Sequence, residues 1–259
     1  MSFRVHPSAI VEAGAELGAG CEVGPYCVVG AGVRLGRGCR LDSHVVLAGD
    51  TEIGEDCRFF PLSSIGQPPQ DLKFRGEHTR LRIGSGNVFR EFVTVHVGTA
   101  GGGGETRIGE RNFFMAYTHI AHDCQIGNHT LFANAATLAG HVAVEDHATI
   151  GAFSGVHQFC RVGQHAYVGG YTVVTQDALP YVLTVGNRAT THGINVIGLQ
   201  RKNFTREAIL ALRKAYQVLV RSRRPVEQAL ATLQEALERH AEVRTLAEFI
   251  RTSRRGVVR

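Results

Sequence analysis

The sequence predicts a mainly β fold, in which a parallel solenoid of hexapeptide repeats is followed by a C-terminal α-helical domain. Three observations predict it. An apolar residue recurs every six positions through most of residues 11–174, glycine is frequent at 31 residues, and helical apolar spacing replaces the six-residue period near residue 205. Glycine tolerates the backbone angles of tight corners. We expect the solenoid domain over residues 1–200 and the helical domain over residues 201–259.

The six-residue period runs through residues 11–65, 83–95 and 108–174, and each of its positions carries an aliphatic or Phe side chain in a chain that is only 44% hydrophobic. Three hexapeptides complete a coil of 18 residues, so side chains 18 apart in an unbroken run lie above one another, about 4.8 Å apart. The fifth position of the repeat is nearly always small, and it holds every cysteine of the chain: Cys21, Cys27, Cys39, Cys57, Cys124 and Cys160. We interpret these thiols as reduced apolar filler rather than as disulfides or metal ligands.

Two interruptions break the period, at about residues 67–82 and 99–107, and both are expected to loop out of the solenoid. Long excursions from a regular scaffold are usually functional or disordered. The first contains Asp71, Lys73 and Arg75, which favours a functional loop.

The last part of the chain predicts helices. Apolar residues follow helical spacing through residues 205–220, Pro225 is placed to open a second helix, and Thr245 with Glu248 forms a capping box for a third. Residues 201–259 hold 14 Lys and Arg against 6 Asp and Glu, whereas residues 1–200 hold 14 against 17. The basic segment suits solvated surface or an acidic protein partner. It lacks the interleaved aromatic residues of a nucleic-acid surface, so no nucleic-acid partner is expected.

The N-terminus lacks the apolar run of a signal peptide, and no stretch approaches 18 apolar residues. We therefore expect a soluble cytoplasmic protein without a transmembrane segment.

Histidines of the second run gather on one edge of the predicted solenoid. His122, Gly140 and Gln158 are 18 residues apart, so we expect them in one column, flanked by His119, His141 and His157. A histidine followed directly by Asp123 can move protons near neutral pH, and the same cluster could ligate a metal. A second column, His129, His147 and His165, has no carboxylate partner, and exposed turn residues are the favoured interpretation.

Five motifs, taken together, are similar to those of the UDP-N-acetylglucosamine O-acyltransferases that start lipid A synthesis, a family of hexapeptide-repeat transferases. They are Gln-Asp-Leu-Lys at 70–73, HIAHDC at 119–124, Ala-Gly-His at 139–141, His-Gln-Phe at 157–159 and Gly-Ile-Asn at 193–195. The resemblance covers nearly the whole chain. It implies a left-handed parallel β-helix, assembled as a homotrimer with sites between neighbouring prisms.

The resemblance implies transfer of an (R)-3-hydroxyacyl group from acyl carrier protein to the 3-hydroxyl of UDP-N-acetylglucosamine. His122 is then the general base, Asp123 orients its ring, and the Gly140 N–H is the donor to the developing oxyanion. Neither a metal nor a cofactor is expected, since the phosphopantetheine thioester of acyl carrier protein is a co-substrate. The acidity of that carrier gives the basic segment its partner.

Further positions take substrate-binding roles by the same resemblance. Those implied for the sugar, diphosphate or acyl portion are Gln70, Asp71, Lys73, His119, His141, His157 and Gln158, and those implied for the nucleotide are Asn195, Arg201 and Lys202. Gly170 is implied to set the depth of the acyl groove, and its missing side chain predicts a longer acyl chain. Ile197 departs from the family, which usually has Glu there, so a 3-amino sugar acceptor stays open. Arg188 and His78 also depart from it.

Three other interpretations were weighed. An N-acyltransferase of the same pathway carries an additional N-terminal domain, for which a period starting at residue 11 leaves no room. A zinc carbonic anhydrase on the same solenoid could recruit His119 and His122, but the adjacent Asp123 and the 70–73 motif favour acyl transfer. A solenoid that only binds a partner would have no reason to gather base, carboxylate and glycine on one edge.

Overall fold

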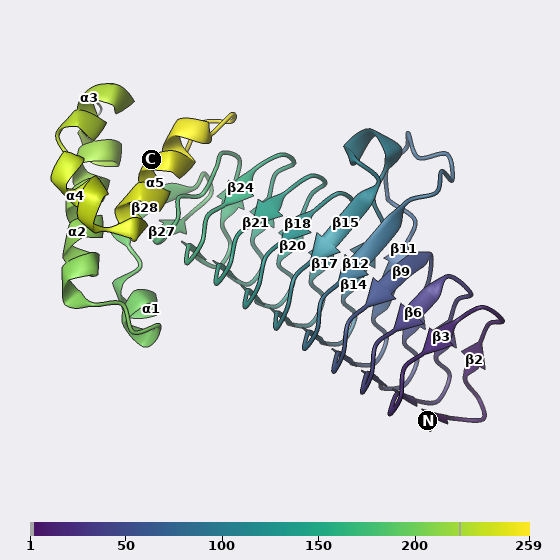
Figure 1. Ribbon diagram of the computed structural model, residues 1–259. Helices are drawn as coiled ribbons and strands as arrows, with labels where there is room; N and C mark the ends of the chain where they lie inside the picture. Colours follow the sequence, from purple (N-terminus) through teal and green to yellow (C-terminus); the bar gives the residue numbers. More distant parts are fainter. Residues whose placement is uncertain (1–2, 223) are drawn as a thin grey trace.

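Short parallel strands wind into a left-handed β-helix with three faces (Figure 1). The computed structural model describes residues 3–222 and 224–259. The first sheet contains β1 (Arg4–Val5), β4 (Glu22–Val23), β7 (Arg40–Leu41), β10 (Arg58–Phe59), β13 (Val88–Phe89), β16 (Phe113–Phe114), β19 (Leu131–Phe132), β22 (Thr149–Ile150), β25 (Tyr167–Val168), β27 (Val182–Val185) and the antiparallel β28 (Thr190–Ile194). The second contains β2 (Ile10–Val11), β5 (Val28–Val29), β8 (Val46–Leu47), β11 (Ser64–Gln67), β14 (Thr94–His96), β17 (His119–Ile120), β20 (Thr137–Leu138), β23 (Gly155–Val156) and β26 (Val173–Val174). The third contains β3 (Glu16–Leu17), β6 (Val33–Leu35), β9 (Asp50–Ile53), β12 (Arg80–Ile83), β15 (Glu105–Ile108), β18 (Gln125–Ile126), β21 (Ala143–Val144) and β24 (Arg161–Val162).

The six-residue period is the strand pattern, because the periodic residues point into the prism and are buried from Val23 to Val174. Four of them, Phe59, Phe89, Phe114 and Phe132, form a stack with ring centroids 4.8 to 5.0 Å apart. The six cysteines are buried and unbridged, as their small-filler interpretation predicted.

Each coil has three corners, named here by the sheets they join: the first corner links the first sheet to the second, the second corner links the second to the third, and the third corner closes the coil. Non-glycine residues with left-handed backbone angles recur at all three, as at Tyr171 (first, φ 55°), Asp123 (second, φ 61°) and His147 (third, φ 60°). This conformation turns the chain sharply.

Both interruptions of the period leave from the second corner (Figure 1). The first joins β11 to β12 and the second joins β14 to β15, with a 3-10 turn η1 (Ala100–Gly102) inside it. β12 begins at Arg80 and β15 at Glu105, so each excursion ends three residues before the limit expected from the sequence. Strand pairing has resumed at these residues: Arg80 aligns with Asp50 on the preceding coil and with Glu105 on the following one.

Helices gather at the C-terminal end of the prism (Figure 1). They are α1 (Val196–Arg201), α2 (Arg206–Tyr216) with its π-helical continuation η2 (Gln217–Arg221), α3 (Val226–Ala231), α4 (Gln234–Arg239) and α5 (Ala241–Thr252). The predicted helix over 205–220 is present, and Pro225 precedes α3. α4 was not predicted. The division at residue 200 stays a prediction, and α1 spans it.

The capping box at Thr245 was wrong. α5 begins at Ala241, and the Thr245 hydroxyl donates to the Ala241 carbonyl inside the helix. Glu248 instead pairs with Arg251 one turn later. Among the described residues, no helix is long and apolar enough to cross a membrane.

Candidate active site

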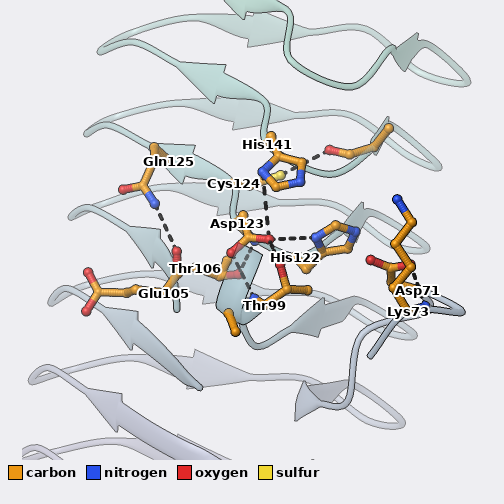
Figure 2. Close-up of polar contacts among 12 residues, drawn as sticks. Asp71, Lys73, Thr99, Glu105, Thr106, His122, Asp123, Cys124, Gln125 and His141 are labelled. Atoms are coloured by element: carbon orange, nitrogen blue, oxygen red, sulfur yellow. Dashed lines mark hydrogen bonds and ion pairs between the residues drawn. The ribbon is translucent and has the colours of Figure 1, made fainter. Parts of the chain in front are cut away.

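His122 and Asp123 lie in the second corner between β17 and β18. The left-handed backbone of Asp123 folds its carboxylate back beside the preceding residue, so that His122 Nδ1 lies 2.7 Å from Asp123 Oδ2 (Figure 2). Because a carboxylate only accepts hydrogen bonds, Nδ1 carries the proton and Nε2 is left as the basic nitrogen. The His122 side chain is 15% exposed, so this nitrogen can be reached.

Two threonines hold Asp123, whose side chain is fully buried: Thr99 binds its carboxylate and Thr106 binds its backbone N–H. The Thr99 N–H donates to Oδ1 at 2.9 Å and the Thr99 hydroxyl donates to Oδ2 at 2.6 Å. The Asp123 N–H donates to Thr106 Oγ1 at 2.7 Å. Sequence reasoning missed Thr99 and Thr106; the only signal was that both fall within the second interruption.

Gly140 lies directly against the His122 ring, one coil further on. A Cβ built on Gly140 would be 2.5 Å from Cε1 and 2.7 Å from Nε2 of that ring, so only glycine leaves room for the imidazole. The His141 N–H donates to the His122 carbonyl, which fixes the stacking of the two coils. The Gly140 N–H makes no backbone hydrogen bond within the described residues.

Three more histidines lie around His122 and Asp123. The His141 ring meets His122 edge to face at 5.1 Å, and burial lowers the pKa of His141. His119 shares a 2.7 Å hydrogen bond with Thr94, and burial, with the nearby His122, lowers its pKa. His96 packs against His119, and burial lowers the pKa of His96 to about 4. His96 was not singled out from the sequence, although it is only 5% exposed and its Nδ1 has no hydrogen-bond partner within the described chain.

The first interruption brings two more predicted residues to this corner. Asp71 and Lys73 lie on the side to which His122 points (Figure 2), and the charge of Asp71 acts on His141. The Lys73 N–H donates to Asp71 Oδ1 at 2.9 Å, which shapes the loop. Gln70 is exposed on the same loop, and His157 and Gln158 are exposed two coils beyond His122.

The remaining predicted residues lie elsewhere on the chain. Asn195 caps α1, and its side-chain amide donates to the His165 carbonyl at the third corner. Lys202 lies near His147 and His165: burial lowers the pKa of both histidines, and the charge of Lys202 lowers it further. Arg201 is exposed at the end of α1, and Gly170 is exposed beside Tyr171 at the first corner. Thus one chain does not gather all the predicted residues at His122.

The second histidine column is a stack at the third corner. His129 and His147 have ring centroids 5.0 Å apart, and His147 and His165 are 4.6 Å apart. Their left-handed backbone confirms that they are turn residues, but only His129 is exposed. Burial lowers the pKa of His165 to about 4. Among the described residues, the trio with metal-like spacing is instead His122, Asp123 and His141, whose ligand atoms lie within 4.8 Å of one another.

Comparisons with known proteins match this chain to acyltransferases over nearly its whole length. A family model described as UDP N-acetylglucosamine O-acyltransferase, domain 2, matches residues 177–258, and a model of bacterial transferase hexapeptide repeats matches residues 105–140. The chain is 52% identical over 257 residues to the acyl-[acyl-carrier-protein]–UDP-N-acetylglucosamine O-acyltransferase of Anaeromyxobacter sp. (strain K), with 99% of this chain and 100% of the relative covered. It is 54% identical over 256 residues to the enzyme of that name from Alkalilimnicola ehrlichii, with 99% of each chain covered.

Solved structures give the same picture. LpxA from Acinetobacter baumannii superimposes with a TM-score of 0.96 at 39% identity, covering 98% of this chain and 99% of that one. UDP-N-acetylglucosamine O-acyltransferase from Moraxella catarrhalis gives 0.95 at 40% identity over the same shares.

Proposed function

Because the chain belongs to the family of acyl-[acyl-carrier-protein]–UDP-N-acetylglucosamine O-acyltransferases, we propose that His122 is the general base of its acyl transfer. The protein transfers an acyl group from acyl carrier protein to UDP-N-acetylglucosamine, the first step of lipid A biosynthesis. The group transferred is an (R)-3-hydroxyacyl chain, and the acceptor is the sugar 3-hydroxyl. The observation that carries the role of His122 is its geometry: Nδ1 is held by a buried carboxylate, and Nε2 lies beside Gly140.

The reaction follows from this arrangement. His122 Nε2 takes the proton of the sugar hydroxyl as its oxygen attacks the thioester carbon. Asp123, held by Thr99, stabilises the imidazolium that forms. The Gly140 N–H donates to the oxyanion of the tetrahedral intermediate. When the carbon–sulfur bond breaks, the phosphopantetheine sulfur leaves and takes the proton from the imidazolium.

Substrate contacts are assigned to the charged groups around the same corner. Asp71, Lys73, His119 and His141 hold the sugar and its diphosphate, with Gln70 adding a neutral hydrogen bond. His157 and Gln158, two coils further along, hold the acyl portion. Lys73 and Lys202 supply the positive charge that a diphosphate requires.

A homotrimer brings the separated residues together. Asn195, Arg201 and Lys202 would reach the His122 corner of a neighbouring prism, and Gly170 would line the acyl groove between the two chains. The exposed side chains along the first corner support an assembly that covers them: Tyr26, Leu62, Phe92, Tyr117, Phe153 and Tyr171 are each 40 to 71% exposed. So long an apolar column is typical of an interaction surface.

The acidic acyl carrier protein would dock on the exposed basic residues of the helical segment, among them Arg206, Arg213, Lys214 and Arg221. Its phosphopantetheine thioester carries the activated acyl group, so the reaction requires no resident cofactor. We place the protein in the cytoplasm, where that carrier and the nucleotide sugar are made.

The spacing of His122, Asp123 and His141 leaves a zinc carbonic anhydrase as the second candidate. Metal analysis and a carbonic anhydrase assay of the purified protein distinguish the two. Acyl transfer to UDP-N-acetylglucosamine at unchanged rate after chelation supports the metal-independent base.

The deciding experiment measures release of the acyl carrier protein thiol in the presence of UDP-N-acetylglucosamine. We expect His122→Ala to lose about a hundredfold to ten-thousandfold in kcat, as removal of a positioned base does, while its circular dichroism spectrum and Tm stay close to those of the wild type. Normal turnover by a folded His122→Ala protein would reject the proposed base.

A further inference from the structure

We propose that Thr99 is a positioning residue for the His122–Asp123 pair, and that the second interruption of the repeat exists to place it. This inference rests on the proposed function of His122. Residues 97–104 leave β14 and fold over the Asp123 carboxylate before β15 begins. In Figure 2 Thr99 lies against Asp123, on the side away from His141.

Thr99 contacts both carboxylate oxygens. Its N–H donates to Oδ1 and its hydroxyl donates to Oδ2, the oxygen that also accepts from His122. The two contacts fix the rotation of the carboxylate and therefore the direction of the His122 ring. Thr99 is only 6% exposed, so its contacts with the carboxylate are largely shielded from solvent. Hydrogen bonds to a buried charge are stronger than those between neutral groups.

The glycine run explains how the loop comes this close. A Cβ on Gly102 would lie 2.0 Å from Asp123 Cγ, so only a glycine can cover the carboxylate at that distance. Gly103 and Gly104 have φ of 96° and 80°, angles that other residues rarely adopt. The N–H groups of Gly102 and Gly104 both donate to the Thr99 carbonyl, which closes the turn around Thr99.

Removing the hydroxyl has a defined consequence. Without that donor the negative charge of Asp123 is less dispersed, so the carboxylate is a stronger proton acceptor and pulls harder on the imidazolium of His122. The acid limb of the pH profile of activity should therefore move to higher pH. At the same time the carboxylate can rotate, and the ring loses its fixed direction.

The test compares Thr99→Val, which keeps the side-chain shape, with Thr99→Ser, which keeps the hydroxyl. We expect Thr99→Val to lower kcat by about tenfold to a hundredfold with KM changed less than about threefold, and to move the acid limb of the pH profile of kcat/KM to higher pH. Thr99→Ser should restore kcat and the profile. Thr130→Val is the matched control, since Thr130 donates both its N–H and its hydroxyl to one oxygen of Asn112.

Wild-type turnover and an unmoved acid limb in folded Thr99→Val would overturn the proposal. A fall in kcat with no shift of the acid limb would also overturn it, because that result is what a purely structural role predicts. If Thr99→Val is not recovered folded, Thr99→Cys, whose thiol is a weak donor, takes its place with the same expectations. His122→Ala separates the two failures: an active His122→Ala rejects the base itself, whereas an inactive one beside a normal Thr99→Val rejects only Thr99.

Discussion

Gly140→Ala adds a single methyl group at the point where two coils meet the His122 ring. The new Cβ would be 2.5 Å from Cε1, 2.7 Å from Nε2 and 3.1 Å from Nδ1. Carbon contacts are favourable only from about 3.5 Å, so the ring must retreat by roughly 1 Å. It cannot retreat freely, because Nδ1 is 2.7 Å from a carboxylate that Thr99 holds in place.

The size of the effect follows from this displacement. A misplacement of about 1 Å at a reacting group costs about a hundredfold in rate, which corresponds to roughly 2.7 kcal/mol in the activation barrier. Stability should change less. Overpacking costs about 1 to 3 kcal/mol, and replacing glycine returns about 0.4 to 1 kcal/mol by restricting the unfolded chain.

The assay is thiol release from acyl carrier protein under saturating UDP-N-acetylglucosamine. We expect kcat of Gly140→Ala to fall about a hundredfold, KM to stay within about threefold, and the protein to remain folded. Gly155→Ala is the control, since a Cβ there meets nothing within 4 Å in the chain and its φ lies outside the left-handed region. A Gly140→Ala protein with more than about a third of wild-type kcat would refute the close packing of this ring against the glycine.

Three further predictions concern the nucleotide, the acyl chain and pH. Lys202→Met should raise the KM for UDP-N-acetylglucosamine about tenfold with little change in kcat, as loss of a phosphate contact does, while Lys214→Met should not. Wild type should prefer acyl chains longer than ten carbons, and Gly170→Met should shorten the optimum in a ladder of acyl carrier proteins, since each buried methylene contributes about 0.8 kcal/mol. Because the pKa of folded His96 is about 4 against an ordinary 6.5, the unfolded chain binds the extra proton between these values. Stability in urea titrations should therefore fall as pH drops from 6.5 towards 4, by at most about 1.4 kcal/mol per pH unit for this group, and His96→Gln should flatten that slope.

The strands could be predicted from the sequence because a period of six leaves little freedom. Once Ile120 and Leu138 both point inward, 18 residues apart, the residues between them must turn three corners, and the stacking of His122 beneath Gly140 follows. The placement of Thr99 could not be predicted in this way. It lies where the period fails, and its contact with Asp123 depends on how the loop closes.

The helical segment shows a different limit. Thr245 and Glu248 have the spacing of a capping box, which is a local signal. The chain has already become helical at Ala241, because Val243, Leu246 and Phe249 are buried in the core of the helical segment. Tertiary burial therefore set the start of α5, as it commonly does when it competes with local preference. Asn195 and Lys202 lie at a different corner from His122. Their positions depend on the chain that follows the last regular repeat, where the period no longer predicts the structure.

The two interruptions are best understood together. Ser64 pairs with Thr94 and Thr94 with His119, offsets of 30 and 25 residues where the regular coil has 18, so two successive coils carry 12 and 7 additional residues. Additional residues within a strand would slip its register and expose the core, whereas at a corner they cost only loop closure. Three corners per coil were available, yet both insertions use the second corner, on the two coils that precede His122. One supplies Asp71 and Lys73 on the side to which the imidazole points, and the other supplies Thr99, which holds the Asp123 carboxylate. The regular coils fix where His122 and Gly140 meet, and the irregular ones supply the groups that the repeat itself cannot provide.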